Sequence, residues 1–220
     1  MQNLKPLFIA FLIYGLTFFI SLFVLKMEML FVGLIAFLTS ILYYHSKNLA
    51  KLKKLTKEAN TDCLTEVYNQ RFFNNTIKEE IFGKPKGKNQ FSILLIDLDD
   101  FKEINDTYGH VFGNTVLKEA GKILMENTRK DDAVVRYGGD EFVILLPDTD
   151  EEKAIRVAKK IEEVFDSKSI PTPKKDRIRI KVSIGMAVFP KDGTDLESLL
   201  EEADARMYSK KAKKFDMPVS

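Results

Sequence analysis

Two carboxylates stand beside a pair of glycines in the segment Arg136-Tyr137-Gly138-Gly139-Asp140-Glu141-Phe142. Apolar runs flank this segment on both sides, which predicts two strands joined by a Gly-Gly turn of type I′. Asp140 and Glu141 would then lie at the exposed end of a hairpin, where their oxygens could bind a divalent metal ion. A solvated charged turn is the alternative interpretation, and this segment alone does not decide between the two.

A second acidic cluster follows the apolar run from Phe91 to Ile96, which predicts a buried strand and ends in Asp97-Leu98-Asp99-Asp100. If this strand pairs with the hairpin in an antiparallel sheet, Asp97 and Asp140 can meet across neighbouring strands, because opposed residues lie about 5 Å apart. Carboxylates so close repel each other unless a cation lies between them. Oxygen ligands, a single cysteine and two distant histidines favour magnesium over zinc. Magnesium held by few carboxylates usually also binds phosphate groups.

The first 45 residues predict a transmembrane helical hairpin. No charged residue occurs from Pro6 to Leu25, and at about 1.5 Å per residue this stretch spans about 30 Å, the thickness of a bilayer core. Lys26-Met27-Glu28 interrupts the apolar sequence before a second uncharged stretch. We therefore expect two spans, at about 6–25 and 29–44, joined by a tight outer turn. A signal peptide is the alternative, but its apolar core would be too long and would lack a small-residue cleavage site.

The distribution of lysines predicts how this hairpin is oriented. Five lysines between positions 47 and 57 follow the second span and Lys5 precedes the first, whereas the outer turn carries only Lys26. Positive charge gathers on the cytoplasmic side, so we expect a multi-pass protein of the inner (cytoplasmic) membrane with both termini and the following domain in the cytoplasm. The single cysteine, Cys63, agrees with a reducing compartment.

Residues 46–60 predict a juxtamembrane helix, because Leu49, Leu52, Leu55 and Ala59 recur at helical spacing. This stripe could pair with a second copy as a dimerisation stalk or pack on the chain's own domain, and we favour the stalk. From Ala59 onward, acidic residues outnumber basic ones. The domain therefore lacks the basic surface typical of a protein that binds a nucleic-acid polymer.

Residues 61–215 alternate predicted helices with predicted strands, and residues 216–220 form a short tail. The patterns predict helices at 70–81, 116–127, 154–165 and 196–212, strands at 91–96, on both sides of Gly138 and at 178–189, and a turn at 83–87. We expect an α+β fold in which helices cover one face of an antiparallel sheet.

Several motifs, in order, resemble the GGDEF domains, a family of diguanylate cyclases that join two GTP molecules into cyclic di-GMP and release pyrophosphate. The resemblance rests on Asp62-Cys63-Leu64-Thr65, Asp97-Leu98-Asp99, Phe101 to Asp106, Thr107 to His110, the hairpin, Ser183-Ile184-Gly185 and Ala203 to Lys211. It implies a ferredoxin-like sheet similar to the palm of adenylate cyclases and polymerases. It also implies a homodimer, because each domain binds one GTP and catalysis takes place between two domains.

The resemblance implies a metal site with two Mg²⁺ or Mn²⁺ ions. Asp97 and Asp140 would hold the ions with help from the carbonyl of Leu98, and Glu141 would be a further ligand or the base that activates the ribose 3′-hydroxyl. Two such ions about 4 Å apart can acidify the hydroxyl and stabilise the leaving pyrophosphate.

The resemblance also implies a set of residues that bind GTP. They are the guanine-reading Asn105 and Asn114, the pocket residue His110, the phosphate-binding Phe101, Lys102 and Lys211, and the hairpin glycines Gly138 and Gly139. Without the resemblance, Asn105 would be read as a turn residue, His110 as structural and Lys211 as a solvated lysine. Asn114 replaces a usual Asp and Phe215 a usual Arg, so softer base selectivity or slower catalysis is expected.

The segment Arg129-Lys130-Asp131-Asp132 matches the RxxD inhibitory site of the family. Arg129 and Asp132 would bind the product cyclic di-GMP, although four mixed charges after a helix are also typical of a solvated helix end. Two alternative functions remain open. A catalytically weak or inactive receptor for cyclic di-GMP or GTP would be expected to lack Asp140 or Glu141, and a mononucleotide cyclase would differ in its product.

Overall fold

The computed structural model of the chain describes residues 4–82 and 90–215, and the side chains of residues 8–79 and 90–212. The chain divides into two compact units, Met1–Thr56 and Lys57–Ser220. The predicted turn at 83–87 and the predicted tail at 216–220 lie outside the described residues, and so does the side chain of Phe215.

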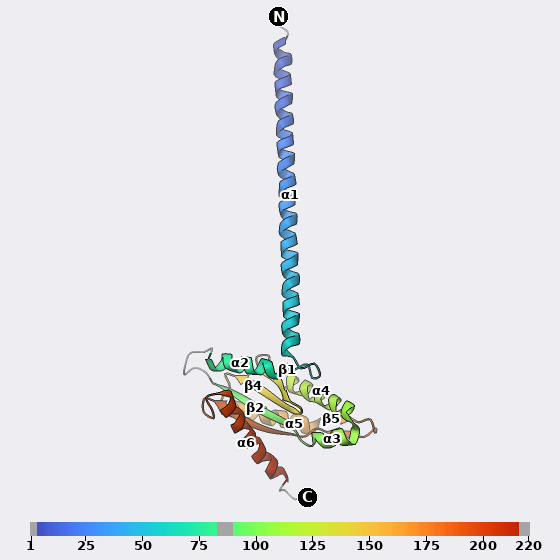
Figure 1. Cartoon of the computed structure of the whole chain (residues 1–220), viewed down its shortest axis with the longest axis vertical. Helices are drawn as coiled ribbons and strands as arrows, with labels where there is room; N and C mark the ends of the chain where they lie inside the picture. Colours follow the sequence, from blue (N-terminus) through green and yellow to red (C-terminus); the bar gives the residue numbers. More distant parts are fainter. Residues whose placement is uncertain (1–3, 83–89, 216–220) are drawn as a thin grey trace. The chain divides into compact units, whose positions relative to one another are not determined.

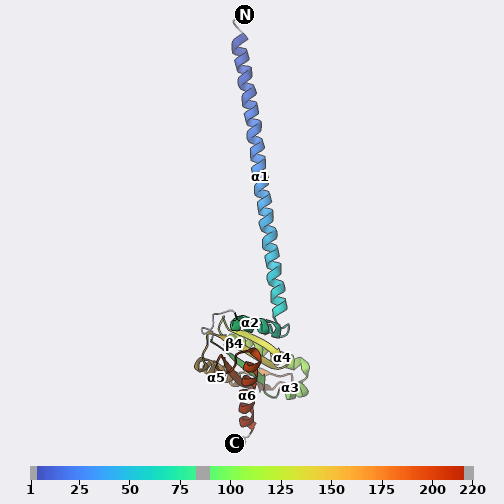
Figure 2. The ribbon, with the colours of Figure 1, turned by 60° about the vertical axis from the view of Figure 1, so that its left-hand side comes forward.

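The N-terminal segment is one continuous helix, α1 (Leu4–Asn60), of 57 residues (Figure 1, Figure 2). The predicted two-helix hairpin is therefore wrong, because the chain does not turn at Lys26-Met27-Glu28. Leu, Lys, Met and Glu all have high helix propensity, and no Gly, Pro or Asn stands between Leu25 and Met29 to end a helix. The multi-pass topology and the expectation that both termini lie on one side of a membrane lose their basis with the hairpin.

One helix in the described part of the chain is long and apolar enough to cross a membrane, judged by length and composition. It is the Phe8–Asn60 part of α1, with a mean hydropathy of 2.5 in its most apolar 18-residue window. Large apolar side chains along it are exposed in the single chain, for example Phe11 and Tyr14. Residues 46–60 form the C-terminal part of the same helix.

A five-stranded sheet in the order β1-β3-β4-β2-β7 organises the second unit. Its strands are β1 (Tyr68–Asn69), β2 (Phe91–Leu98), β3 (Ala133–Gly138), β4 (Glu141–Pro147) and β7 (Val182–Phe189). All neighbouring strands are antiparallel except β1, which pairs in parallel with β3. The order of β2, β3, β4 and β7 is that of a β-α-β-β-α-β ferredoxin-like unit. The predicted antiparallel sheet is thus correct apart from its edge strand, and the fold is α+β with a mixed sheet.

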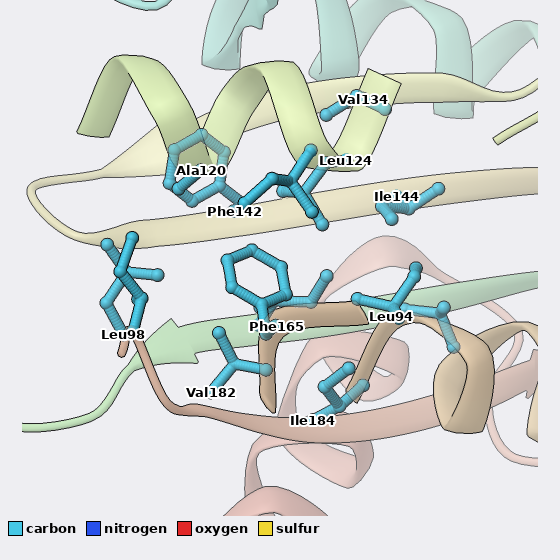
Figure 3. Close-up of a cluster of buried hydrophobic side chains, with 14 of the residues drawn as sticks. Leu94, Leu98, Ala120, Leu124, Val134, Phe142, Ile144, Phe165, Val182 and Ile184 are labelled. Atoms are coloured by element: carbon cyan, nitrogen blue, oxygen red, sulfur yellow. The ribbon is translucent and has the colours of Figure 1, made fainter. Parts of the chain in front are cut away.

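Helices cover both faces of this sheet, so the prediction of helices on one face is wrong. The helix α4 (His110–Glu126) and the helix α5 (Glu151–Ser167) pack on one face, where Phe142, Phe165 and Leu124 meet in the core (Figure 3). The helices α2 (Gln70–Phe82) and α6 (Leu196–Phe215) cover the other face. Alternate residues of β2 are buried on opposite faces, so its unbroken apolar run marks a strand that is covered on both sides.

Two further elements were not expected from the sequence. A short helix, α3 (Phe101–Tyr108), directly follows β2, and a separate two-stranded sheet pairs β5 (Ser169–Pro171) with β6 (Arg177–Arg179). The strand predicted at 178–189 is therefore divided between β6 and β7. At the division, the carbonyl of Lys181 accepts a hydrogen bond from Asp99 N at 2.9 Å, which joins this segment to the end of β2.

The helix α6 packs closely against β7 at Gly185. A Cβ atom at Gly185 would lie 1.9 Å from the carbonyl oxygen of Ala203 and 2.8 Å from Cβ of Met207. A backbone oxygen cannot yield as a flexible side chain can, so a larger residue at position 185 would push the helix away from the sheet. This contact fixes the height of α6 above the strand.

Candidate active site

Strand pairing brings the acidic end of β2 to the hairpin. Asp97 lies opposite Glu141 on β4 and opposite Ser183 on β7. Asp140 lies one residue before β4, and its carbonyl accepts a hydrogen bond from Leu98 N at 3.4 Å. The sequence correctly predicted that the two acidic segments converge, although Glu141, and not Asp140, is the direct cross-strand neighbour of Asp97.

The hairpin between β3 and β4 has a two-residue turn made of Gly139 and Asp140, because Gly138 pairs with Glu141. The predicted Gly-Gly turn of type I′ is wrong, since neither turn residue has the positive φ that this type requires. The register shifts between Arg136 and Gly138. This irregularity moves the turn by one residue and places Asp140 at the tip.

The guanidinium group of Arg136 links the hairpin tip to Asp62 through hydrogen bonds. It donates two hydrogen bonds to the carbonyl oxygen of Gly139, at 2.7 and 3.1 Å, and two to the carboxylate of Asp62, at 3.2 and 3.4 Å. Asp62 also accepts hydrogen bonds from the backbone N and the hydroxyl of Thr65. Partial burial of Asp62 favours its neutral form, but the Thr65 hydrogen bonds and the Arg136 charge outweigh this and lower the pKa of Asp62.

The acidic groups at this end of the sheet repel one another. Partial burial, followed by the negative charges of Asp97, Asp140 and Asp204, raises the pKa of Glu141. The pKa of Asp97 is also raised, first by burial and then by Asp140 and Asp99, despite an opposing contribution from Lys211. The site therefore favours binding of a proton or a cation.

Lys211 of α6 contacts this cluster directly. Its Nζ lies 2.5 Å from Oδ1 of Asp97 and 3.9 Å from Oδ1 of Asp99. The same Asp99 oxygen accepts a hydrogen bond from the Ser183 hydroxyl at 2.7 Å. Lys211 was expected at the phosphates of a nucleotide, and in this structure it lies on a carboxylate.

The donor set at the tip fits a hard divalent cation. Asp97, Asp140 and Glu141 supply carboxylate oxygens and Leu98 a carbonyl oxygen, the ligand types that Mg²⁺ and Mn²⁺ prefer. Within the described residues, no three His, Cys, Asp or Glu side chains already converge into a complete metal-binding group. Because the Lys211 ammonium is paired with the Asp97 carboxylate, binding of a metal ion requires side-chain rearrangement at this site.

The helix α3 begins directly after the acidic end of β2 and carries three of the expected nucleotide-binding residues, Phe101, Lys102 and Asn105. Among the described residues, no side chain caps its start, so the N–H groups of Phe101 and Lys102 have no partner within the helix and can meet an anion. Asn105 was expected in a loop and lies in the helix. His110 and Asn114 are exposed on the first turns of α4.

Asn105 lies against Gly113 of α4. A Cβ atom at Gly113 would be 2.0 Å from Oδ1 of Asn105 and 3.3 Å from the Phe101 ring. The connection between the two helices is Gly109, whose φ of 84° favours glycine, and its N–H donates to the carbonyl of Asn105 at 2.8 Å. Gly109 and Gly113 together allow the Asn105 amide to lie between α3 and α4.

Comparison with known proteins identifies the family to which this fold belongs. A family model described as "Diguanylate cyclase, GGDEF domain" matches residues 59–217. The chain belongs to the GGDEF family. The diguanylate cyclase DosC of Escherichia coli K12 is 36% identical over 151 residues, which are 69% of this chain and 33% of DosC. The chain thus spans about a third of the length of this curated relative.

Solved GGDEF domains have the same architecture. The GGDEF domain of TpbB (YfiN) from Pseudomonas aeruginosa is 33% identical to this chain, with a TM-score of 0.65. The superposition covers 70% of this chain and 89% of the TpbB domain. The GGDEF domain of DgcB from Caulobacter crescentus, solved in complex with cyclic di-GMP, is 26% identical with a TM-score of 0.65 and covers 71% of this chain and 89% of that one.

The RxxD residues of this GGDEF domain lie at the other end of β3 from the hairpin tip. The backbone N of Arg129 donates to Oδ2 of Asp132 at 2.8 Å. Both residues line a cavity of about 340 Å³, whose apolar wall includes Tyr68, Met125 and Val134. Val134 lines the cavity, so the four remaining residues of β3, Val135 to Gly138, separate it from the acidic tip by about 13 Å, at about 3.3 Å per strand residue. The structure therefore places Arg129 and Asp132 together and apart from the other predicted site residues.

Four residues at or near the candidate active site were not among the predicted site residues. Asp99 and Arg136 pair with Lys211 and Asp62, which are far away in the sequence. The charge of Asp204 raises the pKa of Glu141, and Gly113 lies against Asn105 of the preceding helix. Asp99 and Arg136 stand within the motifs that predicted the site, which was the available signal. Asp204 also stands within one of these motifs, Ala203 to Lys211. Gly113 gave no signal of its own, because its proximity to Asn105 depends on how α4 packs against α3.

Proposed function

We propose that the protein is a diguanylate cyclase that condenses two GTP molecules into cyclic di-GMP and two pyrophosphates. The observation that carries this proposal is the pairing of Asp97 with Glu141 in a GGDEF fold, with Asp140 at the adjoining turn. The relatives named as diguanylate cyclases and the relative bound to cyclic di-GMP support it.

The proposed reaction forms two bonds and breaks two. The ribose 3′-oxygen of each GTP attacks the α-phosphate of the other, and a pyrophosphate leaves at each step. Glu141, whose raised pKa favours proton uptake, accepts the proton from the 3′-hydroxyl. The N–H groups of Phe101 and Lys102 and the ammonium of Lys211 orient the phosphates, while Gly138 and Gly139 keep the hairpin narrow beside them.

The proposed cofactors are two Mg²⁺ or Mn²⁺ ions per active site, held by Asp97, Asp140 and the Leu98 carbonyl, while Glu141 acts as the base. When bound, such ions lower the pKa of the attacking hydroxyl and neutralise charge on the leaving pyrophosphate. The oxygen donors and the mutual repulsion of the carboxylates support this assignment.

Incubation of the full chain with GTP and Mg²⁺, followed by chromatography and mass spectrometry of the products, tests the proposed function. We expect cyclic di-GMP and pyrophosphate, and no product after chelation of the metal. Formation of cyclic GMP would identify a mononucleotide cyclase. Binding of cyclic di-GMP without any turnover would identify a receptor.

Guanine recognition is proposed to depend on Asn105, positioned by Gly113, with Asn114 and His110 nearby. We expect Gly113→Ala to raise the KM for GTP about tenfold, because its Cβ displaces the Asn105 amide, and a lost base contact costs about 1 kcal/mol or slightly more. Steady-state kinetics of the single and double variants with Asn105→Ala measure this effect. If Gly113 acts through Asn105, the double variant is no worse than Asn105→Ala alone; additive losses would contradict this role.

Product inhibition is proposed at Arg129 and Asp132. Arg129→Ala is expected to increase the half-inhibitory concentration of cyclic di-GMP at least tenfold, because a guanidinium bonded to guanine is lost. The uninhibited initial rate should stay near that of the wild type, since the cavity lies at the other end of β3. Lys122→Ala, exposed on α4, is the matched control, and equal inhibition of both variants would disprove the site.

We also infer that the apolar part of α1 anchors the protein in the inner membrane, with the GGDEF domain in the cytoplasm where GTP is found. The hydropathy of the helix and the lysines from 47 to 57 that follow its apolar part support this location. Homodimerisation is proposed through the stripe formed by Leu49, Leu52 and Leu55, which are exposed in the single chain. A nucleic-acid polymer is not among the proposed partners.

A further inference from the structure

Lys211 occupies a place in the acidic cluster that a cation would otherwise take. Its ammonium lies 2.5 Å from Asp97 and 3.9 Å from Asp99, and the side chains of the three residues are only 28%, 17% and 9% exposed. An ion pair of this kind is less screened by water than one on the open surface. The pair therefore competes with any other cation that binds Asp97.

The packing of α6 explains why Lys211 reaches this position. Ala203, Met207 and Lys211 follow one another at four-residue steps and so lie on one face of the helix. Ala203 and Met207 are buried, and they contact the strand at Gly185. Lys211 is one turn further along the same face, where the sheet ends in Asp97. The neighbouring Lys210 instead pairs with Glu162 of α5 at 3.6 Å.

We propose that Lys211 is an internal counter-ion that holds Asp97 in the metal-free protein and competes with the divalent ion for this carboxylate. On binding of the metal–nucleotide complex, the ammonium leaves Asp97 for the triphosphate. This inference rests on the proposed function, because it takes Asp97 as a metal ligand. It predicts two effects of opposite sign when Lys211 is removed: tighter binding of the metal alone and weaker binding of GTP.

Titration of the full chain in detergent with Mn²⁺, without nucleotide, tests the first effect through the paramagnetic signal of the free ion. Lys211→Met is expected to bind Mn²⁺ about tenfold more tightly than the wild type. Lys210→Met removes the same charge from the next position and is expected to change the affinity less than twofold. Lys211→Gln serves as a second variant, and a thermal melt without metal shows that each variant is folded.

The second effect is measured by kinetics with saturating Mn²⁺, where Lys211→Met is expected to raise the KM for GTP. An Asp97→Asn control shows whether Mn²⁺ binding depends on Asp97. If it does, and both Lys211 variants bind Mn²⁺ as well as the wild type or more weakly, the counter-ion role is overturned and the metal site is not. Tighter binding in Lys210→Met by the same factor would overturn it as well, since overall charge would then explain the effect. Absence of Mn²⁺ binding in every variant would overturn both this inference and the proposed metal site.

Discussion

Glu141→Gln is expected to lower the rate of cyclic di-GMP formation about a thousandfold. The substitution keeps the shape of the side chain but removes the carboxylate that lies opposite Asp97 and is proposed to accept the 3′-hydroxyl proton, and loss of a general base costs about 10²- to 10⁴-fold. Initial rates at saturating GTP and Mg²⁺, with the product quantified by chromatography, measure the loss.

Glu163→Gln, exposed on α5, is the matched control and should retain the wild-type rate. Cyclic di-GMP formation by Glu141→Gln at more than a tenth of the wild-type rate would contradict a catalytic role for Glu141. The product test on the unmodified chain separates this outcome from a failure of the proposed activity itself.

The same variant should be more stable than the wild type when no metal is present. Burial and then the charges of Asp97, Asp140 and Asp204 raise the pKa of Glu141, so the folded protein holds this proton more tightly than the unfolded chain. Stability therefore falls as pH rises from the unfolded-state pKa through the folded-state pKa. At neutral pH, Glu141→Gln lacks this penalty and its Tm should be higher, whereas in acid below the unfolded-state pKa the two Tm values should converge.

Removal of residues 1–56 is expected to make the specific activity fall with dilution, by about tenfold for each tenfold dilution once monomers dominate. The remaining residues form a compact unit, and a solved relative comprises only the GGDEF domain. Because the proposed reaction needs two domains, its rate follows the square of the monomer concentration, whereas a shared stalk supplies an effective concentration in the millimolar range. Rate measurements over a dilution series, with sedimentation to give the oligomeric state, test this expectation.

A parallel leucine zipper fused in place of residues 1–56 should restore an activity that is independent of dilution. Constant specific activity of the truncated protein under conditions where it sediments as a monomer would contradict catalysis between two domains.

The core of the fold and the convergence of the acidic groups could be predicted because their signals are local. The apolar run ending at Asp97 and the glycines before Asp140 each mark one element, and antiparallel pairing brings their ends together. The unbroken apolar run of β2 also contained the signal for helices on both faces, since a strand with one solvated face alternates.

The predictions were wrong where a short sequence pattern is compatible with two local structures. Lys26-Met27-Glu28 can end a membrane span, but its residues are also good helix formers, and the helix continues. Asn105-Asp106 is typical of a turn but here lies inside the eight-residue helix α3. The contact of Lys211 with Asp97 joins positions 114 residues apart, and only the packing of α6 on Gly185 decides it.

The double attachment of Arg136 has a mechanical consequence. The planar guanidinium group donates hydrogen bonds to Asp62, just after α1 ends, and to the carbonyl of Gly139, beside Asp140. A displacement of the chain at Asp62 therefore either moves the turn that carries Asp140 or breaks the ion pair between Arg136 and Asp62. Strain on this single side chain would therefore change the position of Asp140 in the proposed active site without any rearrangement of the sheet.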